Sequence, residues 1–333
     1  MSKQQKSLKK AINLLIKNGP LQLIERIGIQ LRRRKVLQAR ASPEHIRYEE
    51  DKFASAVKKG PIVDGLIECP ILDFKMKLRV TDPGLSRELI VHGIREEAAV
   101  RHLRRVLPGK ERIVEIGANI GFFALQEAVL TSETAMILAI EPHPDNIELL
   151  QKNISLNGFG PKFKVFQLAV SDKPGTANLF VEPRSNWHHL DSFKEGQIVS
   201  SQNTIQVAVT SVDEICRQNS WNTIDLLRMD VEGHEYAAIA GAQKMLRDSK
   251  KCSIFMEIHP DLLLELGKDP IQLLRDIRDL GFRCSRVCGS PLNEELENPE
   301  WEFIFRKLNI ITARYGTHMF FEKGEQLGGG GRG

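Results

Sequence analysis

Short apolar runs alternate with segments of helical spacing from residue 112 onward. The apolar runs that are short enough for strands cover residues 112–116, 136–140, 163–169, 224–229 and 253–258. Later or inserted runs complete the pattern at 176–181, 204–209, 282–288 and 317–322. Between the strand-like runs, apolar side chains recur every three or four residues, as on the buried face of a helix. This alternation predicts an α/β domain with a mostly parallel sheet covered by helices on both faces.

The first 60 residues follow a different pattern. Residues 5–40 predict helix, broken near Asn18-Gly19-Pro20, and the polar residues 41–60 look like a linker. Residues 1–40 hold eleven Lys and Arg against one acid, a net of about +10, which leaves about −6 for the rest of the chain. A basic amphipathic helix of this kind lies on an anionic membrane surface, binds a partner, or packs as a solvated helix on its own domain. The sequence leaves these alternatives open.

We therefore expect three parts along the chain. They are a basic helical N-terminal extension over 1–60, one α/β domain over 61–325, and a disordered glycine-rich tail over 326–333. Five cysteines without a C-x-x-C pair argue against a disulfide framework. We find no signal peptide, and no apolar run reaches the ~20 residues of a membrane-spanning helix. We expect a cytoplasmic protein, with peripheral contact at the inner face of the membrane through residues 1–40 as an alternative.

The first apolar run leads into a turn of small residues. The turn reads Glu115-Ile-Gly-Ala-Asn-Ile-Gly121, and a helix begins directly after it. A strand, turn and helix of this kind form the nucleotide-binding cleft of a Rossmann-type sheet. Dinucleotide folds place a second glycine where this chain has Asn119, and a polar side chain there obstructs a pyrophosphate. Asn119 can instead bond an amino-acid-like tail, so the turn favours a methyltransferase over a dehydrogenase.

Other polar or small residues follow the neighbouring strands. Ligands of an open α/β sheet bind outside the carboxyl ends of its strands. Glu141 ends the second strand, where a carboxylate can accept both hydroxyls of a ribose, and Ala169 offers small backbone to a flat base. Acids at the ends of strands one and four, Glu115 and Asp230, repel phosphates but suit a cationic ammonium or sulfonium. Together these residues predict S-adenosylmethionine as the cofactor.

With these residues in hand, the chain resembles the FkbM family of S-adenosylmethionine-dependent methyltransferases over residues 110–260. The resemblance is most specific at Glu115–Gly121, at Glu141-Pro-His-Pro-Asp-Asn146 and at Met229-Asp-Val-Glu-Gly-His-Glu235. Glu115 replaces the family's more usual Asp and keeps the charge, and Thr210–Glu214 is similar to the family's "T-L-D-x-L" stretch. The resemblance implies a class I methyltransferase fold with a Rossmann-like, mostly parallel seven-stranded sheet. It also implies O-methylation of a sugar or a related natural product.

The cofactor site that these patterns and the resemblance predict consists of Glu115, Gly117, Ala118, Asn119, Gly121, Glu141, Pro142, Asn146, Ala169 and Asp230.

Methyl transfer from a sulfonium needs an aligned acceptor and a base for its hydroxyl proton. Asp230, Glu232, His234 and His259 come from neighbouring strand ends, and any of them can be that base. We favour His259, because the ordinary histidine pKa suits neutral pH, and we assign Asp230 to the cofactor or the acceptor. His234 can equally face solvent, and Glu232 and Glu235 can instead stabilise the start of a helix, with Glu235 in its first turn. Asp230, Glu232 and His259 could hold a divalent metal, but their spacing does not demand one, and we expect none.

The loop over residues 182–203 is expected to cover the acceptor. Trp187 can stack on a sugar ring or simply pack, and His188 or His189 can bind hydroxyls. We expect a small-molecule, glycan or glycolipid hydroxyl as acceptor and no nucleic acid, while its identity and the oligomeric state stay open. Two alternatives are a nucleic-acid methyltransferase, which lacks support because no Pro-Pro-aromatic stretch follows Asp230, and a non-catalytic module that binds S-adenosylmethionine.

Overall fold

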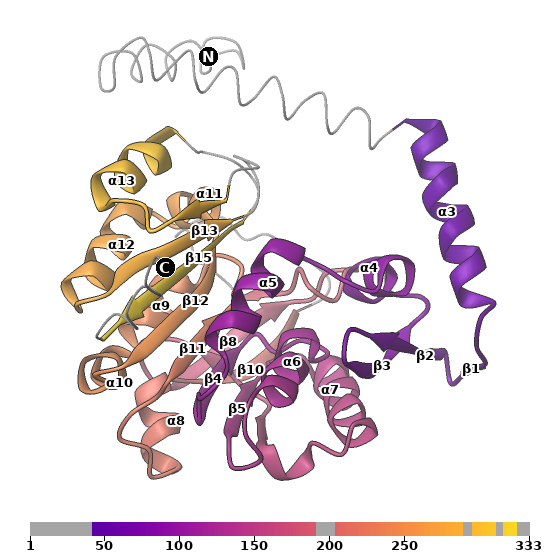
Figure 1. Ribbon diagram of the computed structural model, residues 1–333, viewed down its shortest axis with the longest axis horizontal. Helices are drawn as coiled ribbons and strands as arrows, with labels where there is room; N and C mark the ends of the chain where they lie inside the picture. Colours follow the sequence, from indigo (N-terminus) through magenta and orange to yellow (C-terminus); the bar gives the residue numbers. More distant parts are fainter. Residues whose placement is uncertain (1–41, 191–203, 289–294, 311–315, 325–333) are drawn as a thin grey trace, which may run out of the picture.

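A computed structural model describes residues 42–190, 204–288, 295–310 and 316–324 (Figure 1). An eight-stranded sheet forms its centre, in the order β14-β13-β15-β12-β11-β4-β5-β6. The bounds are β4 Arg112–Ile116, β5 Met136–Ile140, β6 Phe163–Phe166, β11 Leu226–Met229, β12 Cys252–Ile258, β13 Arg283–Cys288, β14 Leu296–Glu297 and β15 Thr317–Lys323. The five strands from β6 to β12 are parallel, and β15 is antiparallel to both of its neighbours. The expected mostly parallel sheet is therefore confirmed, with the two-residue β14 added at one edge.

Side chains of successive strand residues enter two different cores. On β4, Ile113 packs into one core, while Val114 and Ile116 pack into the other, because side chains alternate along a strand. A parallel sheet that is buried on both faces needs such continuous apolar strands. The helices that cover the sheet are α5 Glu97–Val106, α6 Phe122–Leu130, α7 Pro144–Leu156, α8 Val212–Gln218, α9 Glu235–Ala240, α10 Gln243–Asp248, α11 Pro260–Glu265, α12 Pro270–Asp279 and α13 Trp301–Ile310.

An antiparallel meander precedes the central sheet and packs into the core on the side of α5 to α7. Its strands are β1 Ile62–Val63, β2 Leu66–Ile71 and β3 Phe74–Arg79, and α4 (Leu85–His92) follows it. Residues 43–57, which look like a polar linker, form the helix α3 (Pro43–Val57). Ser42 accepts a hydrogen bond from the backbone N–H of His45, and Pro43 occupies the first turn. These capping residues stabilise a helix that has no buried side chain.

A second, four-stranded sheet corrects one expectation. The apolar run 163–169 is not a single strand: β6 ends at Phe166, and Ala169–Val170 forms β7 in the sheet β7-β10-β8-β9. The other strands are β8 Gly175–Phe180, β9 His189–Leu190 and β10 Thr204–Thr210. Ala169 changes sheets because it pairs in parallel with Val209 of β10. The second sheet therefore lies beside the carboxyl ends of the central strands.

The remaining features agree with the sequence where the structure describes them. All five cysteines are free thiols. In the described part of the chain, no helix is long and apolar enough to cross a bilayer. The basic segment 1–41 and the tail 325–333 lie outside the described residues, so the expectations for them stay predictions.

Candidate active site

The turn after β4 brings backbone groups against the neighbouring strand ends. The N–H groups of Gly117 and Ala118 both donate to the carbonyl of Ile140, at 2.9 and 3.0 Å. Gly117 has φ +74°, in the left-handed region, and a Cβ on it would lie 2.1 Å from the carbonyl oxygen of Asp230. The turn after β4 and the end of β11 can approach this closely only because residue 117 has no side chain.

Replacement of Gly117 by alanine is therefore expected to move the end of β11. The new methyl group collides with backbone rather than with a flexible side chain, and the positive φ adds strain. We expect a loss of about 2–4 kcal/mol in the free energy of unfolding, measured by urea denaturation. Gly109→Ala is the matched control, because it has φ +82° and nothing within 4 Å of the added Cβ. Equal losses in the two variants would mean that backbone strain alone, and not the contact with Asp230, explains the loss of stability in Gly117→Ala.

A cavity of about 860 Å³ lies at the carboxyl ends of β4, β5 and β11. The predicted site residues that line it are Gly117, Ala118, Asn119, Glu141, Pro142, Ala169, Asp230, Glu232 and His234. Glu115, Gly121, Asn146 and His259 do not line it, although all four lie next to lining residues in the sequence or in space. Most of the predicted site residues therefore line the cavity, while the other four lie behind its wall.

Glu115 is one of these residues behind the wall. Its side chain is fully buried, and its carboxylate accepts a hydrogen bond of 2.8 Å from Arg228 on β11. Arg228 also lies 3.6 Å from Asp230 and has its guanidinium over the ring of Phe123, at 4.2 Å. Burial raises the pKa of Glu115 to about 7, although Arg228 opposes that shift. Arg228 lines the cavity and was missed; the only signal for it was a basic residue inside an apolar strand.

Glu141, which follows β5, is hydrogen-bonded to the turn after β4. Its carboxylate accepts the N–H of Asn119 at 2.9 Å, the N–H of His143 at 2.9 Å and the side-chain amide of Asn146 at 3.3 Å. Burial raises the pKa of Glu141 to about 7. Asn146 thus acts on the site through Glu141, and the carboxylate still lines the cavity.

The side chain of Asn119 makes hydrogen bonds to other residues of the protein. Its amide donates to the carbonyl of Ser185 at 2.8 Å, and its oxygen accepts the N–H of Ile120 at 2.7 Å. Asn146 donates to the same carbonyl of Ser185 at 3.2 Å. The expectation that the side chain of Asn119 bonds an amino-acid-like tail is therefore not what the geometry favours. Asn119 instead attaches the segment 182–190 to the cofactor turn.

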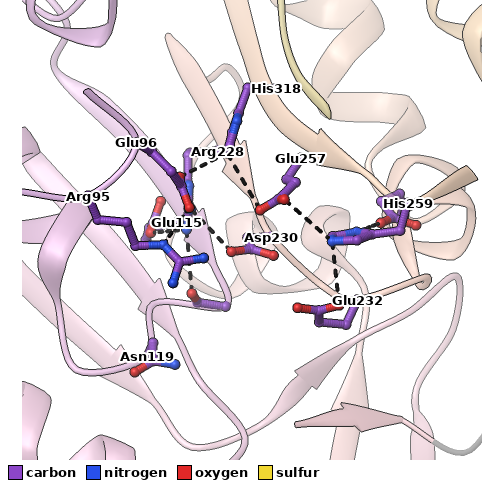
Figure 2. A network of polar contacts seen from close by, with 12 residues as sticks. Arg95, Glu96, Glu115, Asn119, Arg228, Asp230, Glu232, Glu257, His259 and His318 are labelled. Carbon is purple, nitrogen blue, oxygen red and sulfur yellow. Dashed lines mark hydrogen bonds and ion pairs between the residues drawn. The ribbon is translucent and has the colours of Figure 1, made fainter. Parts of the chain in front are cut away.

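Asp230 and Glu232 follow β11, and their carboxylates have different surroundings (Figure 2). Both residues line the cavity. One oxygen of Asp230, Oδ1, is buried and has no hydrogen-bond partner among the described residues. Burial raises the pKa of Asp230 to about 6 and that of Glu232 to about 8. Glu232 has φ +44°, in the left-handed region, and its carboxylate lies 3.4 Å from Nε2 of His259. His234 also lines the cavity, and its Nε2 lies 3.3 Å from the hydroxyl of Ser171.

His259 lies among three carboxylates. Its Nδ1 is 2.6 Å from Glu235, and its Nε2 is 3.4 Å from Glu232 and 3.6 Å from Glu257. Burial lowers its pKa, but the hydrogen bond and charge of Glu235 outweigh that effect and hold the pKa well above its usual value. An imidazolium cannot accept a proton, so this geometry does not favour His259 as the base. It makes His259 a cation that stabilises the ionised form of Glu232.

A second charged group lies between the first turn of α5 and β15. His318 is 2.8 Å from Glu96 and 3.5 Å from Glu257, and these carboxylates raise its pKa to about 10. Glu96 also pairs with Arg95. Arg95 reaches the cavity wall, and its side chain is 19% exposed. Arg95 was not predicted, because it precedes the motif-bearing region and lies in a charged segment.

Two groups of residues have ligand atoms within 4.8 Å of one another: Asp230, Glu232 and His259, and Glu96, Glu257 and His318. In both groups the carboxylates raise the pKa of the histidine, so a proton already balances part of their charge. A metal must displace that proton before it can bind the imidazole. The expectation of no metal stays a prediction.

The described part of the acceptor loop is held by its own contacts. Trp187 is 47% exposed, and the guanidinium of Arg184 covers its ring at 4.3 Å. His188 accepts the N–H of Glu182 at its Nδ1 and stacks on His143, and burial lowers its pKa to about 4. Because Nδ1 is an acceptor in a neutral ring, Nε2 of His188 carries the proton and can donate. His188 and His189 both line the cavity, and residues 191–203 lie outside the described residues.

The sequence is similar to those of known methyltransferases. The pattern of the methyltransferase FkbM domain matches residues 115–284, about half of the chain. The chain is 26% identical over 163 residues to methyltransferase sdnD of Sordaria araneosa, a match that covers 41% of this chain and 62% of sdnD, less than two thirds of that protein. It is 27% identical over 178 residues to the 2-O-methyltransferase NoeI of Sinorhizobium fredii, covering 50% of this chain and 70% of NoeI.

The solved structures that are similar to this chain include methyltransferase FkbM from Methylobacillus flagellatus. That match has a TM-score of 0.39 and 13% identity, and it covers 82% of this chain and 59% of the other. The match of the family pattern spans the strand ends that carry Glu115, Glu141 and Asp230. The cofactor expected from those residues is confirmed with the family. The chain therefore belongs to the FkbM family of S-adenosylmethionine-dependent methyltransferases.

Proposed function

We propose that the protein transfers a methyl group from S-adenosylmethionine to a hydroxyl of a sugar, glycan, glycolipid or related metabolite. The observation that carries this proposal is the pair of carboxylates with different pKa values, Asp230 and Glu232, on one wall of the cavity. Two carboxylates whose environments separate their pKa values can take two roles in one reaction. The name of the relative NoeI, a 2-O-methyltransferase, supports a hydroxyl as acceptor.

The residues of the cavity fit the charges of this cofactor. The unpartnered oxygen of Asp230 suits a cationic ammonium or sulfonium, and Glu141 suits the ribose hydroxyls. Arg95 is a cation on the same wall and suits the carboxylate of the methionine end. Gly117, Ala118, Asn119, Pro142 and Ala169 leave backbone and small side chains beside the adenosine end. When bound, S-adenosylmethionine supplies an activated methyl group on its sulfonium.

We assign the base to Glu232 rather than to His259. Glu232 lines the cavity, and its pKa of about 8 lies close to neutral pH, whereas an ordinary carboxyl group is a much weaker base. It takes the proton from the acceptor hydroxyl, and the neighbouring imidazolium of His259 stabilises the carboxylate before the transfer. Asp230, with a lower pKa of about 6, stays ionised at neutral pH and balances positive charge. His234 lies on the same wall as a further hydrogen-bonding residue.

Titration calorimetry tests the assignment of the cofactor site. We expect S-adenosylmethionine to bind with a dissociation constant of about 1–100 µM and NAD to give no heat. Asp230→Asn is expected to weaken S-adenosylmethionine by about tenfold, since a charge-assisted contact is lost. Asp248→Asn, an exposed carboxylate on α10, is the matched control. A folded sample that gives no heat with S-adenosylmethionine would contradict the proposal.

The location of the protein also belongs to this proposal. We propose a cytoplasmic enzyme whose basic N-terminal segment contacts an anionic membrane surface peripherally. The charge of residues 1–40 supports this idea, because basic segments are attracted to anionic lipids. A lipid-linked acceptor would then be close to the catalytic domain.

A further inference from the structure

A second hollow of about 520 Å³ adjoins the cofactor cavity, and Arg95 and Asn186 line both. It lies between α3, α4 and the segment 184–186, which belongs to the loop expected to cover the acceptor. Three arginines line it: Arg87, Arg95 and Arg184. We call it the arginine hollow.

The arginines are only partly neutralised. Arg87 pairs with Glu50 at 2.9 Å, and Arg95 pairs with Glu96 at 2.5 Å and with Glu88 at 3.3 Å. Of the carboxylates that line the hollow, Glu88 faces Arg95 and Glu49 faces His92, at 3.3 Å. Arg184 has no ion pair among the described residues. Two arginines of the hollow are therefore already paired with carboxylates, and Arg184 is the one whose charge is left for an anion.

Aromatic rings orient two of the guanidinium groups. The guanidinium of Arg87 lies over the ring of Phe53 and that of Arg184 over the ring of Trp187, each at 4.3 Å. A guanidinium that stacks on a ring keeps its N–H groups at its edge, where they can bind an anion bidentately. The ring of Trp187 thus positions Arg184, and the guanidinium covers one face of that ring.

The wall between the hollow and the cavity is fixed. Asp82 is buried and accepts hydrogen bonds from the N–H groups of Gly84, Ser86 and Ser185 and from the hydroxyl of Ser185. These hydrogen bonds hold the pKa of Asp82 below its usual value. A Cβ on Gly84 would lie 2.4 Å from Oδ1 of Asn186, so the two segments are in close contact. That amide oxygen is buried without a hydrogen-bond partner, and a ligand hydroxyl could donate to it.

We propose that the arginine hollow binds an anionic group of the methyl acceptor, a phosphate or a carboxylate. The hydroxyl-bearing part of the same molecule passes Asn186 and enters the cavity beside Glu232. Arg184 and Arg87 hold the anion, and Arg95 stands at the junction of the two spaces. The inference rests on the proposed function and narrows its acceptor class to acidic or phosphorylated hydroxyl compounds.

Equilibrium dialysis tests this inference on the full chain saturated with S-adenosylhomocysteine. The probes are radiolabelled orthophosphate and, separately, radiolabelled glucuronate. We expect one of them to bind at one site per chain, and the double variant Arg87→Gln/Arg184→Gln to bind it about tenfold more weakly or worse. The control is Arg217→Gln/Arg247→Gln, which removes two exposed arginines on α8 and α10. Binding of phosphate alone would identify a phosphorylated acceptor, and binding of glucuronate alone a carboxylated one.

Failure of this inference is distinguishable from failure of the proposed function. If neither anion binds at one site per chain, or if the double variant binds as tightly as the control, the arginine hollow is not an anion site. Binding of S-adenosylhomocysteine is measured on the same samples, and we expect it to be unchanged in both double variants. Loss of that binding in the unaltered protein would instead contradict the proposed function.

Discussion

Replacement of Arg228 by methionine is expected to lower the free energy of unfolding by about 3–5 kcal/mol. Arg228 is 3% exposed and is the cation that Glu115 contacts directly, while Glu127, also fully buried, lies close enough to interact with both. Methionine fills a similar volume over the ring of Phe123 but leaves the buried carboxyl groups without a cation. An unpaired buried charge costs more than the lost ion pair contributed. Urea denaturation at pH 8 measures the loss.

The pH dependence of this loss separates charge from packing. A carboxyl group whose pKa is higher in the folded than in the unfolded protein destabilises the fold once it must ionise. This destabilisation begins near the unfolded pKa, about 4.5, and grows until the pH exceeds the folded pKa. The pKa of Glu115 is already about 7, and removal of Arg228 raises it further. The loss in Arg228→Met should therefore be smaller at pH 5 than at pH 8, and the double variant Arg228→Met/Glu115→Gln should recover part of it. A loss that is equal at both pH values would mean that packing on Phe123, and not charge, is the contribution of Arg228.

The sequence predicted the parts of the fold that depend on local pattern. Apolar runs gave the five parallel strands, because a sheet buried on both faces needs continuous apolar residues. The division of 163–169 between two sheets was not predictable, since β7 is defined by its pairing with Val209, 40 residues away in the chain. The helix α3 was missed because its residues are polar and its evidence lies only in Ser42 and Pro43.

The candidate site, like the fold, was predicted where it depends on local sequence patterns and missed where it depends on distant residues. Residues of the strand-end motifs, such as Asp230 and Glu141, line the cavity as the sequence suggested. The partners of the site residues were not predictable, because they come from distant segments. Ser185 accepts from Asn119 across 66 residues, and Arg228 meets Glu115 across 113. The protonation of His259 was likewise hidden, since it depends on Glu235, which looked like an ordinary acid at the start of a helix.

Replacement of Glu232 by glutamine is expected to lower kcat/KM for methyl transfer by about 10²–10⁴-fold, the usual contribution of a positioned base. A base must be deprotonated to act, so in the unaltered enzyme kcat/KM should rise with pH and level off above about 8, the pKa of Glu232. In Glu232→Gln the residual rate should lose that rise. A labelled-methyl assay between pH 5.5 and 9.5 measures both effects, and Glu133→Gln, with a side chain 97% exposed, is the control.

His259→Asn distinguishes this base from the alternatives. Removal of the imidazolium takes a stabilising charge away from ionised Glu232, so its pKa should rise and the pH profile should move to higher pH while activity persists. If His259 were itself the base, the same substitution would abolish the pH-dependent rate at every pH. If Asp230 were the base, the rise would lie near pH 6 and would disappear in Asp230→Asn. Wild-type turnover in Glu232→Gln, with S-adenosylhomocysteine binding intact, would remove Glu232 from the reaction.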